Sequence, residues 1–518
     1  MTSAKSQTDT QTNQDSRKAV PTVCEPKMMS MSLAEVAEAV GGRLVMPATG
    51  EGARPAGAAG PVATGAVSDS RQAGEGSVFF AIRGERVDGH DYVASVAAKG
   101  AAAAVVEHEV DAPVAQIVVD DSVKALGALA RHNIERRRAS GEPFTIVGIT
   151  GSVGKTTTKD LLRAMLAELG PTVAPVGSFN NEIGLPLTSL KVNAATRYFV
   201  AEMGANHVGE IAYLTTIAPP DVAVVLKVGV AHLGEFGSVE RIAQAKSEIV
   251  RGEVAGGSTV LNADDAHVAA MASIAPGDVT WFGREAEHDG RPLDLEARDV
   301  RHDELDHPFF TLSDGKAAVP VHLAICGDHN VTNALAAATV AHRLGLPLER
   351  IARVLEDQRH ISPHRMAVSR VERGGAAFTL IDDSFNANPD SMRAGLDGLA
   401  AWGASRDPQP ARAAVLGAML ELGADSARLH RGVGAYAAGL GLDAVIAVGS
   451  AADPELDALA ADIADGAREA GCAKVELVHD VDAADRAVAD FASAAADPVV
   501  LLKGSHASGL SALAERWA

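Results

Sequence analysis

Short apolar runs followed by polar, glycine-rich turns recur along most of the chain. In its middle they are FTIVGIT, RYFVAEM, DVAVVLKVGV and STVLNA, and most are followed by a helical apolar period. Buried strands that alternate with helices are typical of a parallel α/β sheet. SVFFAI and AAAAVVE predict a smaller unit upstream, and AAFTLIDD, AAVLGAM, AVIAVGS and PVVLLKG predict another downstream. The pattern therefore predicts an α/β protein of three domains.

Polar segments give the expected boundaries. Residues 1–30 are rich in Ser, Thr, Gln and Asp and have little to bury, so we expect a disordered tail. The helical pattern MSLAEVAEAVGG starts a small α/β domain over 31–141, and RRRASGEP predicts a linker at its end. We expect a central parallel-sheet domain over 142–361 and a Rossmann-like α/β domain over 362–518.

Composition narrows the classes of partner. The 518 residues include 46 basic and 67 acidic side chains, a net charge of −21, which disfavours nucleic acid or an anionic membrane as a partner. Only three cysteines occur, far apart, as expected in a reducing cytoplasm. No apolar stretch approaches the roughly 20 residues that span a bilayer. We therefore expect a cytoplasmic protein without membrane insertion, and the aromatic content of 4% favours a monomer.

The sharpest local signal is the glycine-rich loop in GITGSVGKTTTK, between an apolar strand and a helix. Its glycines allow the backbone to approach phosphate, Lys155 neutralises charge, and Thr156 can ligate Mg²⁺. The strict Walker spacing is not met, because Ile149 stands where its first glycine belongs. A chance Gly-Lys-Thr is the alternative, but the flanking strand and helix favour a nucleotide site. The residues expected to bind ATP here are Gly151, Ser152, Val153, Gly154, Lys155, Thr156 and Thr157.

Two later strands lead to candidate metal ligands. RYFVAE ends on Glu202, and DVAVVLKVGV runs into His232. Ligands gather at the carboxyl ends of parallel strands, so both side chains are expected beside the phosphate loop. A cap or solvated charge is the ordinary role of such a glutamate, and a structural role that of a lone histidine. Their shared position favours a Mg²⁺ site.

Lys246 lies on the apolar face of a predicted helix. That face is formed by Val239, Ile242, Ala243, Ile249 and Val250. Burial would lower the amine pKa, and a neutral amine can add CO₂ to become a carbamate, a negative metal ligand. From these residues alone, a lysine that snorkels to solvent is the preferred interpretation.

Several strings together resemble one known family, the Mur ligases of peptidoglycan synthesis. They include the loop GITGSVGKTTTK, then NNEIGLPLTSL, EMGANHVGEI, HLGEFGSVERIAQAKSEI, GDHNVTNALAA, SPHRM, DDSFNANPDSM and LGAMLELG. The match extends over nearly the whole chain from about residue 31. Within the family these strings are most similar to the members that add the dipeptide D-alanyl-D-alanine to UDP-N-acetylmuramoyl-tripeptide. The resemblance implies an ATP- and Mg²⁺-dependent peptide ligase that releases ADP and phosphate through an acyl-phosphate intermediate.

The resemblance also implies roles for residues at the nucleotide and metal. It makes Lys246 the carbamylated lysine, against the snorkelling interpretation, and assigns Glu202 and His232 to Mg²⁺. It places Asn333 at the adenine with Asn330 nearby, although either asparagine could instead cap the helix. Residues that close over ATP from the third domain would be Arg365 and Asp383.

The same resemblance implies where the two substrates bind. The uridine diphosphate pocket would contain Ser68, Asp69, Ser70 and Arg71, which otherwise read as a surface turn. The muramoyl peptide would meet Asn180 and Asn181. The dipeptide would meet Asn386, Asn388, Lys503 and Ser505, although both asparagines could equally be turn residues ahead of Pro389.

Two other functions remain open at this point. Another amide ligase of the same fold, an earlier Mur enzyme or a folylpolyglutamate synthase, would share the loop and Lys246 but should lack NNEIGLP and DDSFNANP. A nucleotide-driven switch or motor would hydrolyse ATP without ligation. A ligase should close its domains around the reactive acyl phosphate, and we expect that movement to hinge near residues 141 and 361.

Overall fold

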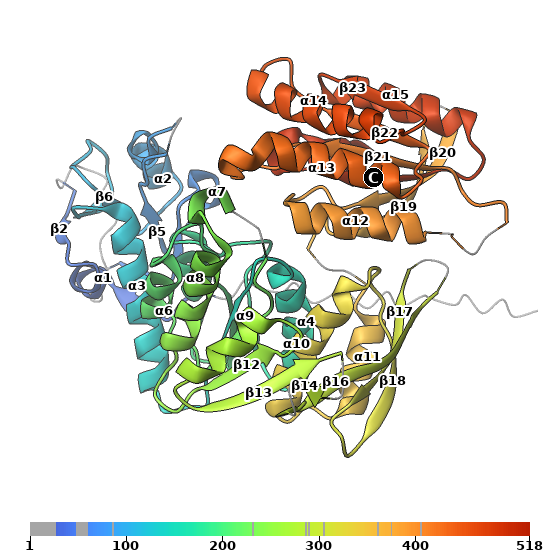
Figure 1. The fold of residues 1–518 in the computed structure, drawn as a ribbon. Helices are drawn as coiled ribbons and strands as arrows, with labels where there is room; N and C mark the ends of the chain where they lie inside the picture. The colour runs from blue at the N-terminus through green and yellow to red at the C-terminus, as the bar shows by residue number, and fades with distance from the viewer. Residues whose placement is uncertain are drawn as a thin grey trace, which may run out of the picture.

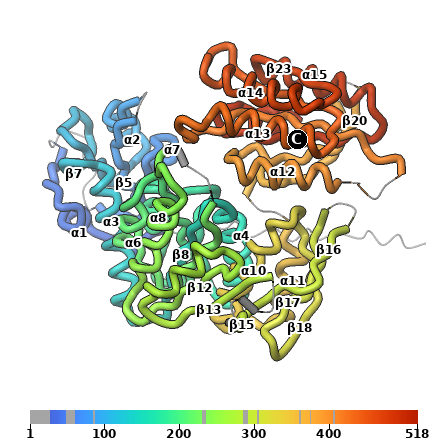
Figure 2. Tube along the Cα trace, viewed as in Figure 1, coloured from blue at the N-terminus to red at the C-terminus, as the bar shows by residue number. Residues whose placement is uncertain are grey.

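Three α/β units, each built on its own sheet, follow one another along the chain (Figure 1). The computed structural model describes residues 27–47, 61–84, 87–229, 233–284, 287–288, 291–303, 306–359, 362–373, 375–402, 404 and 407–517. The expected tail over residues 1–30 lies almost wholly outside these ranges. Figure 2 shows the C-terminal unit above the central unit and the N-terminal unit beside the central unit, at the left of the view. No described helix is long and apolar enough to cross a membrane.

The N-terminal unit contains a five-stranded sheet in the order β2-β7-β6-β5-β4. Its strands are β2 (Arg43–Val45), β4 (Gly65–Val67), β5 (Ser77–Phe80), β6 (Ala103–Val106) and β7 (Ala115–Val118), and β1 (Met31–Ser32) pairs separately with β3 (Val62–Ala63). All neighbours in the five-stranded sheet are parallel except β2 and β7. The helices are α1 (Leu33–Ala39), α2 (Val93–Ala98) and α3 (Ser122–Ala139). The apolar strands therefore form the parallel sheet that their sequence predicts.

A nine-stranded sheet forms the central unit, in the order β18-β17-β16-β13-β12-β11-β8-β10-β9. The strands are β8 (Thr145–Thr150), β9 (Thr172–Val173), β10 (Tyr198–Glu202), β11 (Val222–Val225), β12 (Ser258–Asn262), β13 (Asp278–Gly283), β16 (Leu295–His302), β17 (Pro308–Ser313) and β18 (Ala318–His322). Seven neighbouring strands from β9 to β16 are parallel, as predicted. The antiparallel pairing of β16, β17 and β18 was not predicted.

Helices cover both faces of the central sheet. They are α4 (Lys155–Ala167), α5 (Gly184–Ser189), α6 (Glu210–Ile217), α7 (Leu233–Phe236), α8 (Val239–Arg251), α9 (Ala266–Ala269), α10 (His329–Arg343) and α11 (Leu348–Asp357). The apolar faces of α4, α10 and α11 share one buried cluster, and those of α6 and α8 share another. The sheet lies between these clusters, so its strands are buried on both sides and read as continuous apolar runs.

One predicted strand is too long. DVAVVLKVGV forms β11 only over Val222–Val225. The N–H of Leu226 still donates to the Thr150 carbonyl at the end of β8, and from Lys227 onward the backbone bonds to loops. The N–H of Val228 donates to Asp265 Oδ2 at 2.9 Å, and the N–H of Gly229 donates to Ser152 Oγ at 2.9 Å. These polar side chains capture the backbone, which the apolar sequence could not indicate.

The C-terminal unit has a six-stranded sheet in the order β19-β20-β24-β21-β22-β23, parallel except for β19. The strands are β19 (Ala367–Arg373), β20 (Ala376–Asp382), β21 (Arg412–Gly417), β22 (Ala444–Val448), β23 (Val475–Val478) and β24 (Val499–Lys503). The helices are α12 (Pro389–Ala401), α13 (Ser426–Gly439), α14 (Pro454–Glu469), α15 (Val481–Ala494) and α16 (Leu510–Trp517). This arrangement agrees with the predicted Rossmann-like α/β fold.

Buried polar contacts hold the junction between the N-terminal unit and the central unit. Arg137, at the end of α3, is 2% exposed and donates to the carbonyls of Thr196, Glu142 and Pro143. Arg138 pairs with Asp221 at 3.0 Å. The segment RRRASGEP therefore anchors α3 to the central unit. The exact domain boundaries near 141 and 361 stay predictions.

Candidate active site

The phosphate loop connects β8 to α4 at the carboxyl end of the central sheet. Gly154 has a φ of +83°, and a Cβ there would lie 2.1 Å from Asn333 Oδ1, so only glycine fits. Among the described residues no side chain caps α4, which leaves its first backbone N–H groups directed at the loop. An uncapped helix start behind a glycine turn is suited to bind phosphate.

Lys155 and Thr156 begin α4 and face different partners. Lys155 Nζ donates to the Gly151 carbonyl at 2.7 Å. Burial lowers the pKa of this amine, while the nearby Glu202 opposes that shift. Thr156 Oγ1 lies 2.9 Å from Ser178 Oγ and donates to Glu202 Oε1 at 3.2 Å. The loop thus presents a cation and a hydroxyl beside a carboxylate.

Glu202 ends β10 and is fully buried. Its Oε1 accepts hydrogen bonds from Thr156 and from Asn180 Nδ2, the latter at 2.8 Å. Its Oε2 is buried too, and no described residue bonds to it. A buried carboxylate oxygen without a partner, set among hydroxyls, fits a hard divalent cation such as Mg²⁺. His232, the other predicted metal ligand, lies outside the described residues.

Lys246 lies on α8 and is 2% exposed, so the interpretation that it snorkels to solvent is wrong. Nζ lies 3.5 Å from the Ala205 carbonyl and 5.7 Å from the centre of the Phe236 ring. Burial and then the positive charge of Lys155 lower the pKa of Lys246 to about 7. A substantial neutral fraction at physiological pH is the form that can react with CO₂.

Asn330 and Asn333 share a relay at the start of α10. Asn333 Nδ2 donates to Asn330 Oδ1 at 2.8 Å, and Asn330 Nδ2 donates to the Cys326 carbonyl at 2.7 Å. The N-cap position of α10 belongs to Asp328, so the interpretation of these asparagines as helix caps is wrong. The relay brings Asn333 against Gly154 of the phosphate loop.

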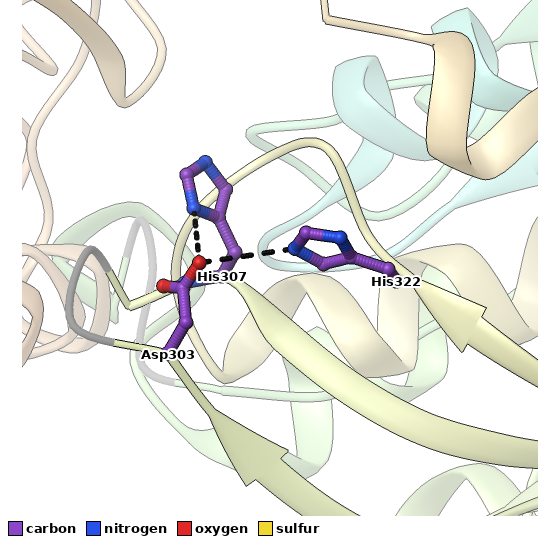
Figure 3. A group of neighbouring side chains, drawn as sticks. All are labelled: Asp303, His307 and His322. Atoms are coloured by element: carbon purple, nitrogen blue, oxygen red, sulfur yellow. Dashed lines mark hydrogen bonds and ion pairs between the residues drawn. The ribbon is translucent and has the colours of Figure 1, made fainter.

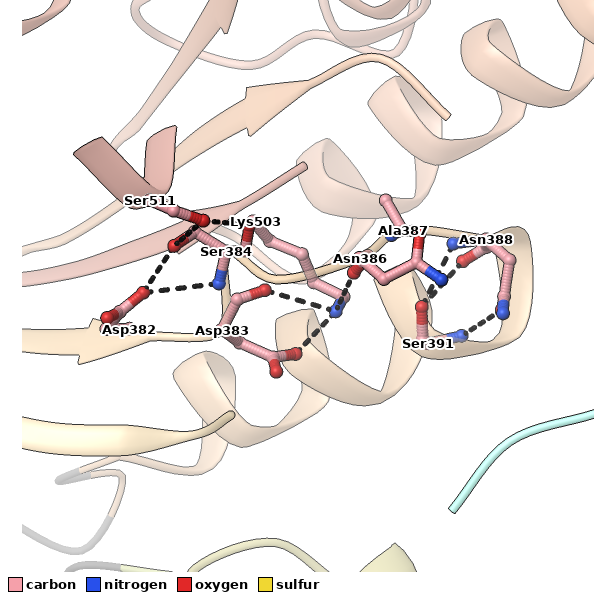
Figure 4. Close-up of polar contacts among 9 residues, drawn as sticks. All are labelled: Asp382, Asp383, Ser384, Asn386, Ala387, Asn388, Ser391, Lys503 and Ser511. Carbon is pink, nitrogen blue, oxygen red and sulfur yellow. Dashed lines mark hydrogen bonds and ion pairs between the residues drawn. The ribbon is translucent and has the colours of Figure 1, made fainter. Parts of the chain in front are cut away.

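The C-terminal unit contributes a second group of polar side chains (Figure 4). Lys503, 1% exposed at the end of β24, lies 2.5 Å from Asp383 Oδ2 and 3.2 Å from the Asn386 carbonyl. Asn388 is the N-cap of α12, and its Oδ1 accepts from the Ser391 N–H at 2.9 Å. Asn388 therefore has the turn role left open by the sequence, and its contact with a substrate stays a prediction.

Arg365 bridges the two units. Its Nη2 donates to Ser178 Oγ at 2.8 Å, and its guanidinium lies 4.5 Å from the centre of the Phe385 ring. Ser178 also touches Thr156, so one hydroxyl joins the third domain to the phosphate loop. Sequence reasoning missed Ser178, although it stands immediately ahead of the string FNNEIG.

One cavity of about 1540 Å³ collects most of these side chains. Predicted residues that line it are Ser152, Val153, Gly154, Lys155, Thr156, Thr157, Asn180, Asn181, Glu202, Asn330, Asn333, Arg365, Asp383, Asn386, Asn388 and Lys503. Its volume exceeds the roughly 300–1,000 Å³ of a site for one small molecule, so it can hold more than one ligand. His329 and Arg284 also line it and were not predicted.

Five predicted substrate residues do not line this cavity: Ser68, Asp69, Ser70, Arg71 and Ser505. The Arg71 side chain is 87% exposed and pairs with Asp69 at 2.8 Å. That pairing holds the pKa of Asp69 near 2. The structure thus places the proposed diphosphate turn at the surface of the N-terminal unit, and its binding role stays a prediction.

Known proteins match the chain in sequence and in structure. Family models match residues 149–341 (Mur ligase middle domain), 364–506 (Mur ligase, glutamate ligase domain) and 64–134 (Mur ligase family, catalytic domain). The UDP-N-acetylmuramoyl-tripeptide--D-alanyl-D-alanine ligase of Mycobacterium tuberculosis is 41% identical, over 94% of this chain and 98% of that protein. The Escherichia coli protein of the same name is 34% identical, over 74% and 80%.

Solved structures agree with these sequence matches. A crystal structure of MurF from Acinetobacter baumannii superposes with a TM-score of 0.78 and 31% identity, covering 95% of this chain and 99% of that one. MurF ligase from Thermotoga maritima, in complex with ADP, gives a TM-score of 0.70 and 29% identity over 88% and 96%. Together with the glycine loop and the cavity beside it, these matches show that the chain belongs to the Mur ligase family.

Proposed function

We propose that this protein uses ATP to join D-alanyl-D-alanine to UDP-N-acetylmuramoyl-tripeptide, which gives the pentapeptide precursor of peptidoglycan, ADP and phosphate. The observation that carries the proposal is one cavity where the phosphate loop, Glu202 and the third-domain residues Arg365 and Lys503 meet. A nucleotide switch needs no second chemical site facing its γ-phosphate, whereas a ligase does. The relatives at 41% and 34% identity carry the name of this ligase.

The reaction proceeds in two transfers. A carboxylate oxygen of the tripeptide attacks the γ-phosphorus of ATP, and the bond between this phosphorus and the β–γ bridging oxygen breaks. ADP departs, and the tripeptide now carries an acyl phosphate. The dipeptide amine then attacks the acyl carbon, loses a proton and expels phosphate. Lys155 and the uncapped start of α4 stabilise the charge on the transferred phosphoryl group, chiefly by position and electrostatics.

Glu202 and Thr156 would hold Mg²⁺ beside the phosphate loop, with His232 as a further predicted ligand. When bound, it would neutralise phosphate charge. The neutral amine of Lys246 would add CO₂, with formation of an N–C bond and release of a proton, and the resulting carbamate would supply a further negative charge to hold the ion. The buried position of Lys246 and its lowered pKa support this assignment.

Different residues bind the two substrates. Asn180 and Asn181 contact the muramoyl peptide, while Asn386, Lys503 and Ser505 receive the dipeptide. Ser68 to Arg71 bind the uridine diphosphate, for which Arg71 must leave Asp69 and turn to the ligand.

We further propose a monomeric cytoplasmic enzyme that closes its domains before chemistry. Small-angle scattering with an ATP analogue and both substrates should show compaction, and an unchanged radius would contradict closure.

The function is tested by phosphate release with ATP and Mg²⁺, adding UDP-N-acetylmuramoyl-tripeptide, D-alanyl-D-alanine or both. We expect turnover only with both substrates and a product with the mass of the pentapeptide. Phosphate release that ignores both substrates would favour the switch. Turnover with a different acceptor or amino acid, such as a folate and glutamate, would assign another ligase of the fold.

A further inference from the structure

Three metal-binding side chains converge at the edge of the central sheet, apart from the cavity (Figure 3). Asp303 follows β16, His307 precedes β17, and His322 ends β18. His307 Nδ1 lies 3.1 Å from Asp303 Oδ2, and His322 Nε2 lies 3.8 Å from the same oxygen. All three ligand atoms lie within 4.8 Å of one another.

The backbone holds these side chains in place. Asp303 and His307 are joined by the bond from the Asp303 N–H to the His307 carbonyl, at 3.1 Å. In return Asp303 Oδ1 accepts from the His307 N–H at 2.9 Å, so the other carboxylate oxygen faces the two imidazoles. The His322 ring stacks on Phe309 with a centroid distance of 3.9 Å and an angle of 11°. The group is therefore positioned by the two bonds between Asp303 and His307 and by the pairing of β17 with β18, and not by ion pairing alone.

We propose that Asp303, His307 and His322 bind one divalent ion of the zinc class. Two imidazoles and a carboxylate are ligands that Zn²⁺ prefers, whereas Mg²⁺ prefers an all-oxygen shell. Ligand bonds of about 2.0–2.2 Å separate tetrahedral ligand atoms by roughly 3.3–3.6 Å. The two imidazole nitrogens lie 3.1 and 3.8 Å from Asp303 Oδ2, on either side of this range. The side chains are 30%, 22% and 47% exposed, which leaves solvent access for the ion and for water as the remaining ligand.

Two other histidine–aspartate pairs among the described residues have no third ligand within metal-binding distance. His342 Nε2 lies 3.3 Å from Asp314, and His479 Nδ1 lies 2.6 Å from Asp457. Within the described part of the chain, Asp303, His307 and His322 form the one group of three that satisfies metal-ligand proximity. An ordinary surface ion pair explains two side chains, but not the convergence of a third from another strand.

The site's position suggests what the ion would do. Asp306 lies in the same turn, and its carbonyl accepts from the Gly327 N–H at 2.9 Å, just ahead of α10. Its carboxylate lies 3.5 Å from where a Cβ of Gly398 on α12 would stand. The ion would therefore fix a turn that touches both the nucleotide-side helix and the third domain. Since the unfolded chain lacks the arranged ligands, Zn²⁺ should raise the melting temperature.

The test is calorimetric titration of tag-free, full-length protein with Zn²⁺ in a buffer containing excess Mg²⁺, which saturates oxygen-rich sites. We expect about one Zn²⁺ ion to bind per protein molecule, with an affinity that depends on the histidine ligands. His322→Ala should weaken this binding by at least about 100-fold and abolish the rise in melting temperature. His342→Ala is the matched control, because it removes a histidine from an aspartate pair in the same domain, and its binding should match the wild type.

Equal binding by the wild type and His322→Ala would overturn the proposal, as would equal losses in both variants. Circular dichroism checks that His322→Ala is folded, which we expect because the side chain is half exposed. X-ray absorption at the zinc edge gives a second, independent result on the wild type. Two imidazole ligands would support the site, and a shell of oxygen alone would refute it.

Discussion

Gly154→Ala tests the contact between the phosphate loop and the relay formed by Asn330 and Asn333. At Gly154 the φ of +83° is unfavourable for alanine, and the new Cβ would lie 2.1 Å from Asn333 Oδ1. Asn333 cannot turn away freely, because its amide is bonded to Asn330, which is bonded in turn to the Cys326 carbonyl. The substitution must therefore displace either the loop or the relay.

The expected cost has two parts. Left-handed backbone costs a non-glycine residue about 1–2 kcal/mol, and forcing an extra methyl into a packed contact costs about 1–3 kcal/mol. The second part acts where ATP binds, so we expect nucleotide affinity to fall by about 2 kcal/mol, or roughly 30-fold. The first part should appear chiefly as a lower melting temperature.

Gly345→Ala separates the two parts. Gly345 follows α10 with a φ of +99°, and a Cβ there would meet no atom within 4 Å. This variant should lose stability but keep its affinity for ATP, measured by calorimetry with Mg²⁺ present. If Gly154→Ala also binds ATP as the wild type does, the loop does not depend on its contact with Asn333, and the reasoning is refuted.

Three further predictions concern buried charges. Glu202→Gln should raise the Mg²⁺ concentration needed for activity and lower kcat/KM by about 100-fold, because the unpaired oxygen loses its charge. An unchanged dependence on Mg²⁺ would exclude Glu202 as a ligand of the ion. Activity in CO₂-depleted buffer should fall and recover with bicarbonate in the wild type, whereas Lys246→Arg should be inactive and unresponsive. Burial raises the pKa of Glu253 from 4.5 to about 7, so the folded state keeps a proton that the unfolded state loses in this window. The contribution of Glu253 to stability should therefore fall by about 2–3 kcal/mol as pH rises from 4.5 to 7. Glu253→Gln, which can still accept from Thr259, should remove this contribution, so its melting temperature relative to the wild type should rise over the same pH range.

Local patterns were enough to predict the strands and the phosphate loop. Buried parallel strands are apolar on both faces, and the glycine loop needs particular residue types at fixed spacing. Glu202 was also predictable, because the carboxyl end of a parallel strand fixes where its side chain must lie. In contrast, no motif predicted the antiparallel pairing of β16, β17 and β18, which extends the central sheet.

Contacts between distant segments could not be predicted from the same patterns. Lys246 illustrates the limit, since helical periodicity placed it on the apolar face but could not decide between burial and snorkelling. The surrounding tertiary structure decided it, leaving the side chain 2% exposed. Asn388 shows the converse, because an asparagine before Pro389 has the same local signature whether it caps a helix or binds a substrate.

The third domain's linker returns to the helix that carries the phosphate loop. The N–H and hydroxyl of Ser362 donate to Asp160 Oδ2 at 2.8 and 2.7 Å, and Asp160 lies on α4. Three residues further along, Arg365 reaches Ser178, which touches Thr156 at the start of the same helix. A movement of the third domain must therefore strain or break bonds to α4. Because we propose that the start of α4 also faces the phosphates of ATP, domain position and nucleotide binding are mechanically coupled through the first two turns of this helix.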